Sequence, residues 1–176
     1  MTNLWDKSFK TINTPGVQEF GRLLDALGLD KNLAQLTAQG VLQTDMPIYD
    51  LEGLLRLPAY NSGILEQLRP FVTVLPILTT VNVNTAPPEV LMAAIPGLSR
   101  SAAGAFVQQR ATSPIKSADE IASLLNKLGS AQGITIDASL VDVRSQYWLA
   151  RSEIRMGRGI FVSSALIQRS QAPLPS

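Results

Sequence analysis

The spacing of apolar residues predicts helices over much of the chain. The first helix follows Thr14 and Pro15, which supply an N-cap and a proline at the first helical position, and it ends at Gly28. Asp30 is placed to cap a second helix, which is expected to end near Gly40. Three later segments repeat the helical spacing: residues 51–55, 64–68 and 117–128, the last beginning with a Ser-x-x-Glu capping box.

The segment Val81–Arg110 combines a strand with a helical hairpin. Its first four residues, VNVN, alternate between apolar and polar, which favours a short half-buried strand. Thr85 is a good N-cap for the next helix, and two prolines are tolerated in its first turn because those N–H groups lack helical partners. Pro96 and Gly97 end this helix, and a second helix begins near Ser99.

Strand-like alternation flanks the helical region. Residues 8–13 can form an edge strand, and residues 134–169 predict a β-hairpin that turns at Gly157-Arg158-Gly159. The apolar face of the hairpin's first strand switches, which predicts a bulge near Arg151. A two-stranded hairpin is marginally stable alone, so it should pack on the helices or pair with other strands. We therefore predict an α+β fold in four parts: an N-terminal strand region (1–13), a helical domain (14–129), a C-terminal hairpin (134–169) and a disordered tail (170–176).

Composition narrows the classes of function. The chain has 176 residues, 45% of them hydrophobic, and a net charge of +1, so it can form a core but has no strong overall field for nucleic acid or anionic membrane. It contains no cysteine and no histidine, which excludes thiol catalysis, serine–histidine catalysis and zinc–thiolate sites. No apolar run approaches the ~20 residues that span a bilayer, so the chain as given is expected to be soluble.

We predict no catalytic residue, no cofactor and no metal site. The sequence contains no nucleophile elbow, phosphate loop or paired-carboxylate motif. Asp45, Asp50 and Glu52 are close together, but their spacing does not match a calcium loop, so capping and solvation explain them better. The chain is therefore expected not to be an enzyme.

The helical hairpin resembles a helix-hairpin-helix, a motif that can hold a nucleic-acid phosphate on the backbone N–H groups of its turn. The turn would consist of Gly97, Leu98, Ser99 and Arg100. The phosphate-binding version has a second glycine where this chain has Ser99, and glycine is the residue most tolerant of positive φ. A purely structural hairpin and a DNA-binding hairpin are therefore both open, and DNA binding is the alternative function.

The same region carries a second resemblance. The strand NVNTA, residues 82–86, leads directly into a helix and follows an apolar stretch that ends in Leu75-Pro76. In these features the chain resembles the K-type minor pseudopilins of bacterial type II secretion, the GspK family. Supporting matches lie at residues 20–29 (FGRLLDALGL), 117–128 and the two strands of the C-terminal hairpin. The resemblance implies a helical, SAM-like domain inserted into a small antiparallel pseudopilin-type sheet.

The resemblance also implies a role. Members of this family are structural proteins at the tip of the periplasmic pseudopilus, where they assemble with I- and J-type minor pseudopilins to support protein export across the outer membrane. The resemblance thus implies a periplasmic domain of an inner-membrane-anchored protein of a Gram-negative bacterium. The family's N-terminal anchor helix has no counterpart here, so the sequence is expected to be a partial chain.

Two further expectations concern sites. Some relatives bind calcium at an acidic, glycine-rich segment, which is largely absent between Gly40 and Pro47, so we carry over no calcium site. Tyr147 and Trp148 lie on opposite faces of the hairpin's first strand. The outward one is a candidate partner contact, with an ordinary exposed aromatic as the alternative.

Overall fold

The computed structural model describes residues 2–3, 15–44, 48–75, 77, 79–128, 137 and 139–169. It divides into two compact units, Met1–Val143 and Arg144–Ser176, which are described separately. The predicted strand at residues 8–13, the Thr14 cap and the tail from residue 170 lie outside the described residues. Within the described part of the chain, no helix is both long and apolar enough to cross a membrane.

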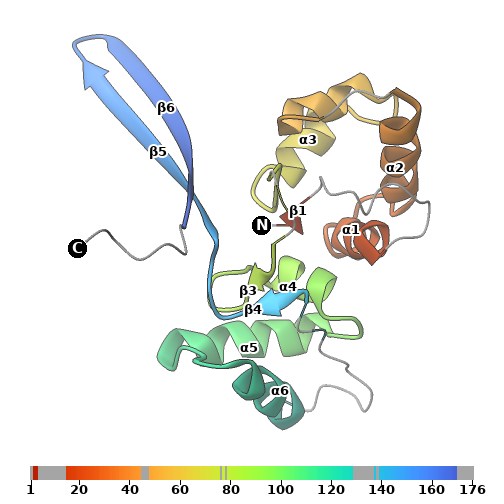
Figure 1. Ribbon diagram of the computed structural model, residues 1–176, viewed down its shortest axis with the longest axis vertical. Helices are drawn as coiled ribbons and strands as arrows, with labels where there is room; N and C mark the ends of the chain where they lie inside the picture. Colours follow the sequence, from red (N-terminus) through yellow and green to blue (C-terminus); the bar gives the residue numbers. More distant parts are fainter. Residues whose placement is uncertain are drawn as a thin grey trace. The chain divides into compact units, whose positions relative to one another are not determined.

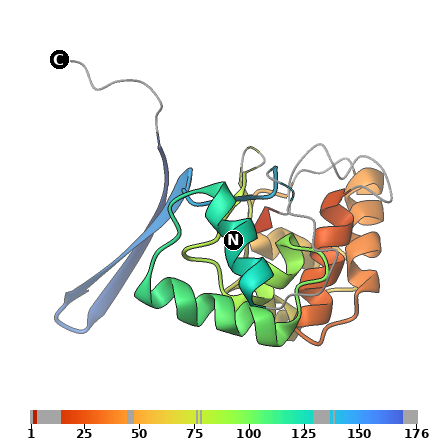
Figure 2. The same ribbon diagram turned by 90° about the horizontal axis from the view of Figure 1, so that it is seen from below.

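The first unit is mainly helical (Figure 1). Its helices are α1 (Pro15–Ala26), α2 (Asn32–Thr44), the 3₁₀ helix η2 (Leu51–Arg56), α3 (Ser62–Leu68), α4 (Pro88–Ala94), α5 (Arg100–Thr112) and α6 (Ala118–Lys127). Its strands have two residues each: β1 (Thr2–Asn3), β2 (Val72–Thr73), β3 (Val81–Asn82) and β4 (Val141–Asp142). In Figure 2 the same helices are seen from below, with α1 beside α2 and α5 beside α6.

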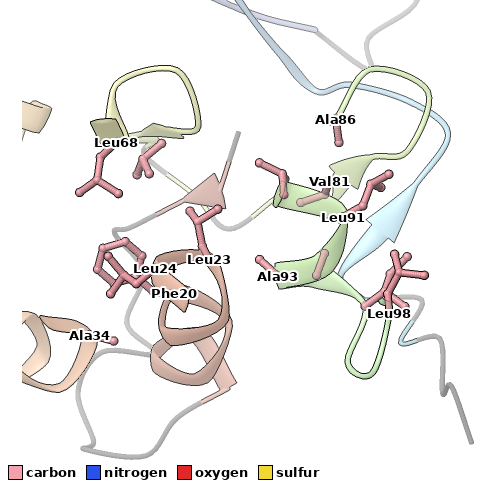
Figure 3. Close-up of a cluster of buried hydrophobic side chains, with 14 of the residues drawn as sticks. Phe20, Leu23, Leu24, Ala34, Leu68, Val81, Ala86, Leu91, Ala93 and Leu98 are labelled. Atoms are coloured by element: carbon pink, nitrogen blue, oxygen red, sulfur yellow. The ribbon is translucent and has the colours of Figure 1, made fainter. Parts of the chain in front are cut away.

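Helix α1 packs against both α2 and α4. Its apolar face, at Val17, Phe20, Leu23 and Leu24, is buried. Figure 3 shows Phe20, Leu23 and Leu24 in a hydrophobic cluster with Leu91 and Ala93 of α4. Gly28 follows the helix with a φ of +72°, which a glycine adopts without strain, so the predicted end of this helix is confirmed.

Helix α2 differs from its prediction, because it does not end near Gly40 but continues to Thr44. The reason is packing against Leu57: a Cβ added at Gly40 would lie 2.4 Å from Leu57 Cδ2. Gly40 therefore allows a close approach within the helix rather than ending it. Asp30 accepts a hydrogen bond from the N–H of Asn32 at 2.9 Å, in agreement with its predicted position before the helix.

The short strands pair in parallel over long sequence separations. Strand β1 pairs with β2, and β3 pairs with β4 through Val81–Val141 and Asn82–Asp142. The predicted strand at the start of VNVN is confirmed. Its partner is β4, so our assignment of residues 141–142 to the C-terminal hairpin was wrong. Those two residues alternate like the rest of the hairpin, and pairing across 60 residues leaves no local signal in the sequence.

The second unit is an antiparallel hairpin of β5 (Tyr147–Met156) and β6 (Gly159–Gln168), drawn in blue in Figure 1. The turn has Gly157 at a φ of +59°, as the glycine-containing turn predicted. Our prediction of a bulge near Arg151 was wrong, because the strands pair residue for residue from Tyr147–Gln168 to Met156–Gly159. Apolar side chains lie on both faces of the ribbon, so the switch of face needs no extra residue.

Candidate functional site

The helical hairpin of α4 and α5 is built around Gly97, which has a φ of +80°. Helix α4 begins at Pro88 with Pro87 as its N-cap, so our prediction of Thr85 as the cap was wrong. Thr85 instead lies in a turn, where its N–H and its hydroxyl both donate to the Asn82 carbonyl. The predicted start of the second helix is confirmed, since the Ser99 hydroxyl accepts a hydrogen bond from the N–H of Ala102 at 3.2 Å.

The four residues of the predicted phosphate-binding turn are consecutive, and three of them, Leu98, Ser99 and Arg100, make internal contacts. Leu98 is buried and its N–H donates to the Ile95 carbonyl. Ser99 caps α5 with a φ of −73°, so no second glycine is required there. The Arg100 guanidinium donates to the Ala26 carbonyl at the end of α1 and forms an ion pair with Glu89 at 3.3 Å. These contacts join the turn to α1 and α4, as expected of a hairpin with a structural role.

The NVNTA segment forms a fixed connection between β3 and the loop after α5. The Asn84 side-chain amide donates to the Ile115 carbonyl at 2.8 Å and accepts from the Ile115 N–H at 2.9 Å. The N–H of Asn84 in turn donates to the Asn82 side chain at 2.9 Å. These two hydrogen bonds pair both the N–H and the carbonyl of Ile115, and so they fix the loop against the NVNTA segment.

Arg110 completes the connection and was missed as a site residue. Its guanidinium donates to the carbonyls of Val83 and Ala86, which both belong to the NVNTA segment. Burial lowers the pKa of Arg110, but a guanidinium stays charged at any physiological pH. A signal was present in the sequence: Arg110 follows the buried Phe106 by four residues, so it lies on the inward face of α5.

Two partly buried polar side chains of the first unit, Arg22 and Tyr60, make internal hydrogen bonds. Arg22 Nε donates to the Ala93 carbonyl at 2.7 Å and joins α1 to α4. Burial raises the pKa of Glu19, beside Arg22, and burial also raises the pKa of Tyr60 to about 12, so this phenol is neutral at physiological pH. The Tyr60 hydroxyl lies 2.6 Å from the Thr37 hydroxyl.

No group of three or more acidic side chains in the described ranges is arranged to hold a metal ion. Asp50, one of the acids considered for calcium, caps η2 by accepting from the Gly53 N–H at 2.9 Å. Glu52 forms an ion pair with Arg69 at 2.9 Å, and Asp45 lies outside the described residues.

An open groove of mixed charge lies between α1 and α2, lined by Gln18, Arg22, Asp25, Lys31 and Asn32 among others.

The second unit presents a different kind of surface, with large apolar side chains exposed along both strands. They are Trp148, Leu149, Ile154, Met156, Ile160, Phe161, Val162, Leu166 and Ile167. Of the two aromatic candidates, Tyr147 is half-buried and Trp148 is 44% exposed. Apolar surface of this extent on one hairpin is typical of a protein–protein contact.

Comparison with known proteins gives a family match for the segment that contains the α4–α5 hairpin. Residues 81–144 match the family model of type II secretion system (T2SS) protein K. This segment of the chain is therefore similar to T2SS protein K. The matched residues begin at β3 and include the NVNTA turn, α4, α5, α6 and β4, so the K-type resemblance of the sequence is confirmed.

The structural comparison agrees with this assignment. The chain is similar to GspK in "The Crystal Structure of the GspK-GspI-GspJ complex from enterotoxigenic Escherichia coli Type 2 Secretion System", with a TM-score of 0.69 and 18% sequence identity. The match covers 96% of this chain and 70% of that chain. At this identity the similarity establishes the fold, and it confirms the predicted α+β class. A search of curated proteins gave no significant match.

Proposed function

We propose that the protein is a structural component of the tip of the type II secretion pseudopilus, where it assembles with I- and J-type minor pseudopilins. The observation that carries the proposal is the match of residues 81–144 to protein K, together with the fold of a protein crystallised in a GspK–GspI–GspJ complex. Its site of action would be the periplasm, as part of a protein anchored in the inner membrane. Its contribution to export would be made through surfaces and not through chemistry.

The residues support a non-enzymatic role. The chain has no histidine or cysteine, and the polar groups at the α4–α5 hairpin serve as caps and internal hydrogen-bond partners. Arg100 and Arg110 are engaged by backbone carbonyls of the protein, which is the arrangement of a rigid scaffold. The exposed apolar side chains of the β5–β6 hairpin supply surface for a partner.

Sedimentation velocity tests the proposal directly. The chain would be run alone, with each of the soluble I- and J-type minor pseudopilin domains, and with both together. A species with the mass of a 1:1:1 complex is expected in the three-component mixture. If the three proteins sediment as independent species at tens of micromolar, these domains do not form the proposed complex and the proposal fails.

A further inference from the structure

The two faces of the β5–β6 hairpin differ in chemistry. Directly opposed residues share a face in an antiparallel pair, so the register assigns every side chain to one side. One face has no ionisable group: it consists of Trp148, Ala150, Ser152, Ile154, Met156, Gly159, Phe161, Ser163, Ala165 and Ile167. The other carries all the charges of the two strands, at Arg151, Glu153 and Arg155.

We call the second side the arginine face: Tyr147, Leu149, Arg151, Glu153, Arg155, Ile160, Val162, Ser164, Leu166 and Gln168. Arg155 Nε and Glu153 Oε1 lie 2.8 Å apart, so these two charges offset one another. Arg151 forms no ion pair with any described residue of the hairpin and stands opposite Ser164.

Arg151 has Ser164 opposite it and Glu153 next to it along the strand on the same face, and its other neighbours are apolar and exposed. The pair Leu149–Leu166 lies on one side of it, and Val162 lies diagonally on the other. Leu149 and Val162 are each 52% exposed, and Leu166 is 44% exposed. An exposed arginine beside aliphatic side chains combines a charged group with apolar area, and arginine is enriched in protein interfaces and among the residues that carry most of the binding energy.

The charge balance of the unit indicates what kind of partner fits. Residues 144–169 contain five arginines and one glutamate, while the remainder of the chain has more acidic than basic residues. A carboxylate is the natural partner of a guanidinium, because two parallel hydrogen bonds can join the two groups. A partner that presents a carboxylate within an apolar patch therefore complements this face in both charge and polarity.

We propose that the arginine face is the surface through which this chain binds a partner pseudopilin domain, with Arg151 as the anchor for a carboxylate of that partner. This inference rests on the proposed function and adds to it the location and chemistry of the contact. The uncharged face offers no group that could pair with a carboxylate, so an anchor of this kind lies on the arginine face.

The test compares two charge reversals that are matched in size. Arg151→Glu removes the anchor, while Arg158→Glu makes the same change of charge in the turn at the tip of the hairpin. Each variant of the chain is titrated into a mixture of the I- and J-type domains at 150 mM salt. We expect Arg151→Glu to weaken binding by at least about tenfold and Arg158→Glu by less than about threefold. Leu149→Ser should also weaken binding, because it removes apolar area beside the anchor.

The outcomes separate this inference from the function on which it rests. If the unaltered chain forms no complex, the proposed function fails and the inference falls with it. If the complex forms and the two charge reversals bind alike, the arginine face is not the contact and the proposed function stands. Thermal unfolding of each variant alone is the control, since a loss of stability confined to Arg151→Glu would assign the face to a contact within the chain and overturn the inference.

Discussion

At the scale of single residues, a few long polar side chains hold the first unit together by bonding to backbone carbonyls. Arg22 reaches Ala93, Arg100 reaches Ala26, and Arg110 reaches both Val83 and Ala86. A carbonyl inside a structure must be paired, and a guanidinium has enough donors to pair two at once. These arginines therefore fix segments that are distant in sequence.

Arg110→Ala should destabilise the protein by about 2–3 kcal/mol, because it leaves two partly buried carbonyls without their charged donor. Arg110→Lys should recover only part of this loss, since one ammonium cannot reproduce the two-pronged geometry. Urea unfolding followed by circular dichroism measures both changes. Arg144→Ala, in the other unit, is the control and should lie within about 0.5 kcal/mol of the unaltered protein. Equal effects of Arg110→Ala and Arg144→Ala would show that the connection contributes little.

Glu19 gives a prediction for the dependence of stability on pH. Burial, and the nearby Asp137, raise its pKa above the ordinary value, while Arg22 opposes the shift. A carboxyl with a raised pKa in the folded state takes up protons more readily there than in the unfolded chain. Its contribution to stability is therefore present in acid and is lost as the pH rises through the raised pKa.

Glu19→Gln should accordingly be more stable than the unaltered protein at pH 7, and the difference should shrink as the pH falls to about 4, near the ordinary pKa of glutamate. Urea unfolding at a series of pH values between 4 and 8 measures the difference. A variant that is less stable at pH 7 would show that the attraction between Glu19 and Arg22 outweighs the cost of burial.

At the scale of elements, glycine has different roles in two helices. Gly104 in α5 has open space where a Cβ would be, and its φ is not positive. Gly40 in α2 has Leu57 in that space. The same substitution should therefore have opposite effects at the two positions.

Gly104→Ala should stabilise the protein by about 0.5–1 kcal/mol, the usual gain from alanine over glycine inside a helix. Gly40→Ala should lose that gain and destabilise the protein, because the buried Leu57 must move, at a typical cost of about 1–3 kcal/mol. Thermal unfolding of the two variants side by side gives the comparison. Equal stabilisation by both would show that Leu57 repacks freely.

Elements marked by local chemistry could be predicted from the sequence, and elements defined by distant contacts could not. Gly28, Ser99 and Ser117 mark helix ends by their own capping or turn geometry, and the structure has them in those roles. The extension of α2 past Gly40 depends on Leu57, and the pairing of β3 with β4 depends on a strand 60 residues away. Propensity and spacing carry no information about such neighbours.

The candidate sites follow the same division. The sequence indicated the α4–α5 hairpin and the importance of NVNTA, and both lie in the segment that matches protein K. The spacing of Arg110 from Phe106 indicated that it lies on the inward face of α5. The acceptors of Arg100 and Arg110 could not be predicted, because they are backbone carbonyls that any sequence supplies. The composition of the arginine face also required the register, since the expected bulge at Arg151 would have moved residues to the opposite side.

At the scale of the whole molecule, the hydrophobic core belongs to one unit. Every buried residue of the core cluster lies between Val17 and Val141, including the fully buried Phe20, Leu91 and Phe106. The hairpin of the second unit contributes no residue to this cluster.

A fragment of residues 1–143 should therefore keep its helical circular dichroism and unfold cooperatively, because it contains the entire core cluster. On our inference about the arginine face, the same fragment should fail to join the complex with the I- and J-type domains. Thermal unfolding and sedimentation velocity check the two statements independently. A fragment that is unfolded at 25 °C would show that the core of the first unit is not sufficient by itself.

The parallel pairing of β3 with β4 has a further consequence for the history of the fold. Because Val81 and Val141 are paired, the helices α4, α5 and α6 enter and leave at one place. The residues that match protein K, 81–144, cover almost the same stretch. A segment whose two ends meet can be transferred between proteins with little disturbance, since the host needs only two adjacent attachment points. The NVNTA turn and Arg110 would then be transferred together with α4, α5 and α6.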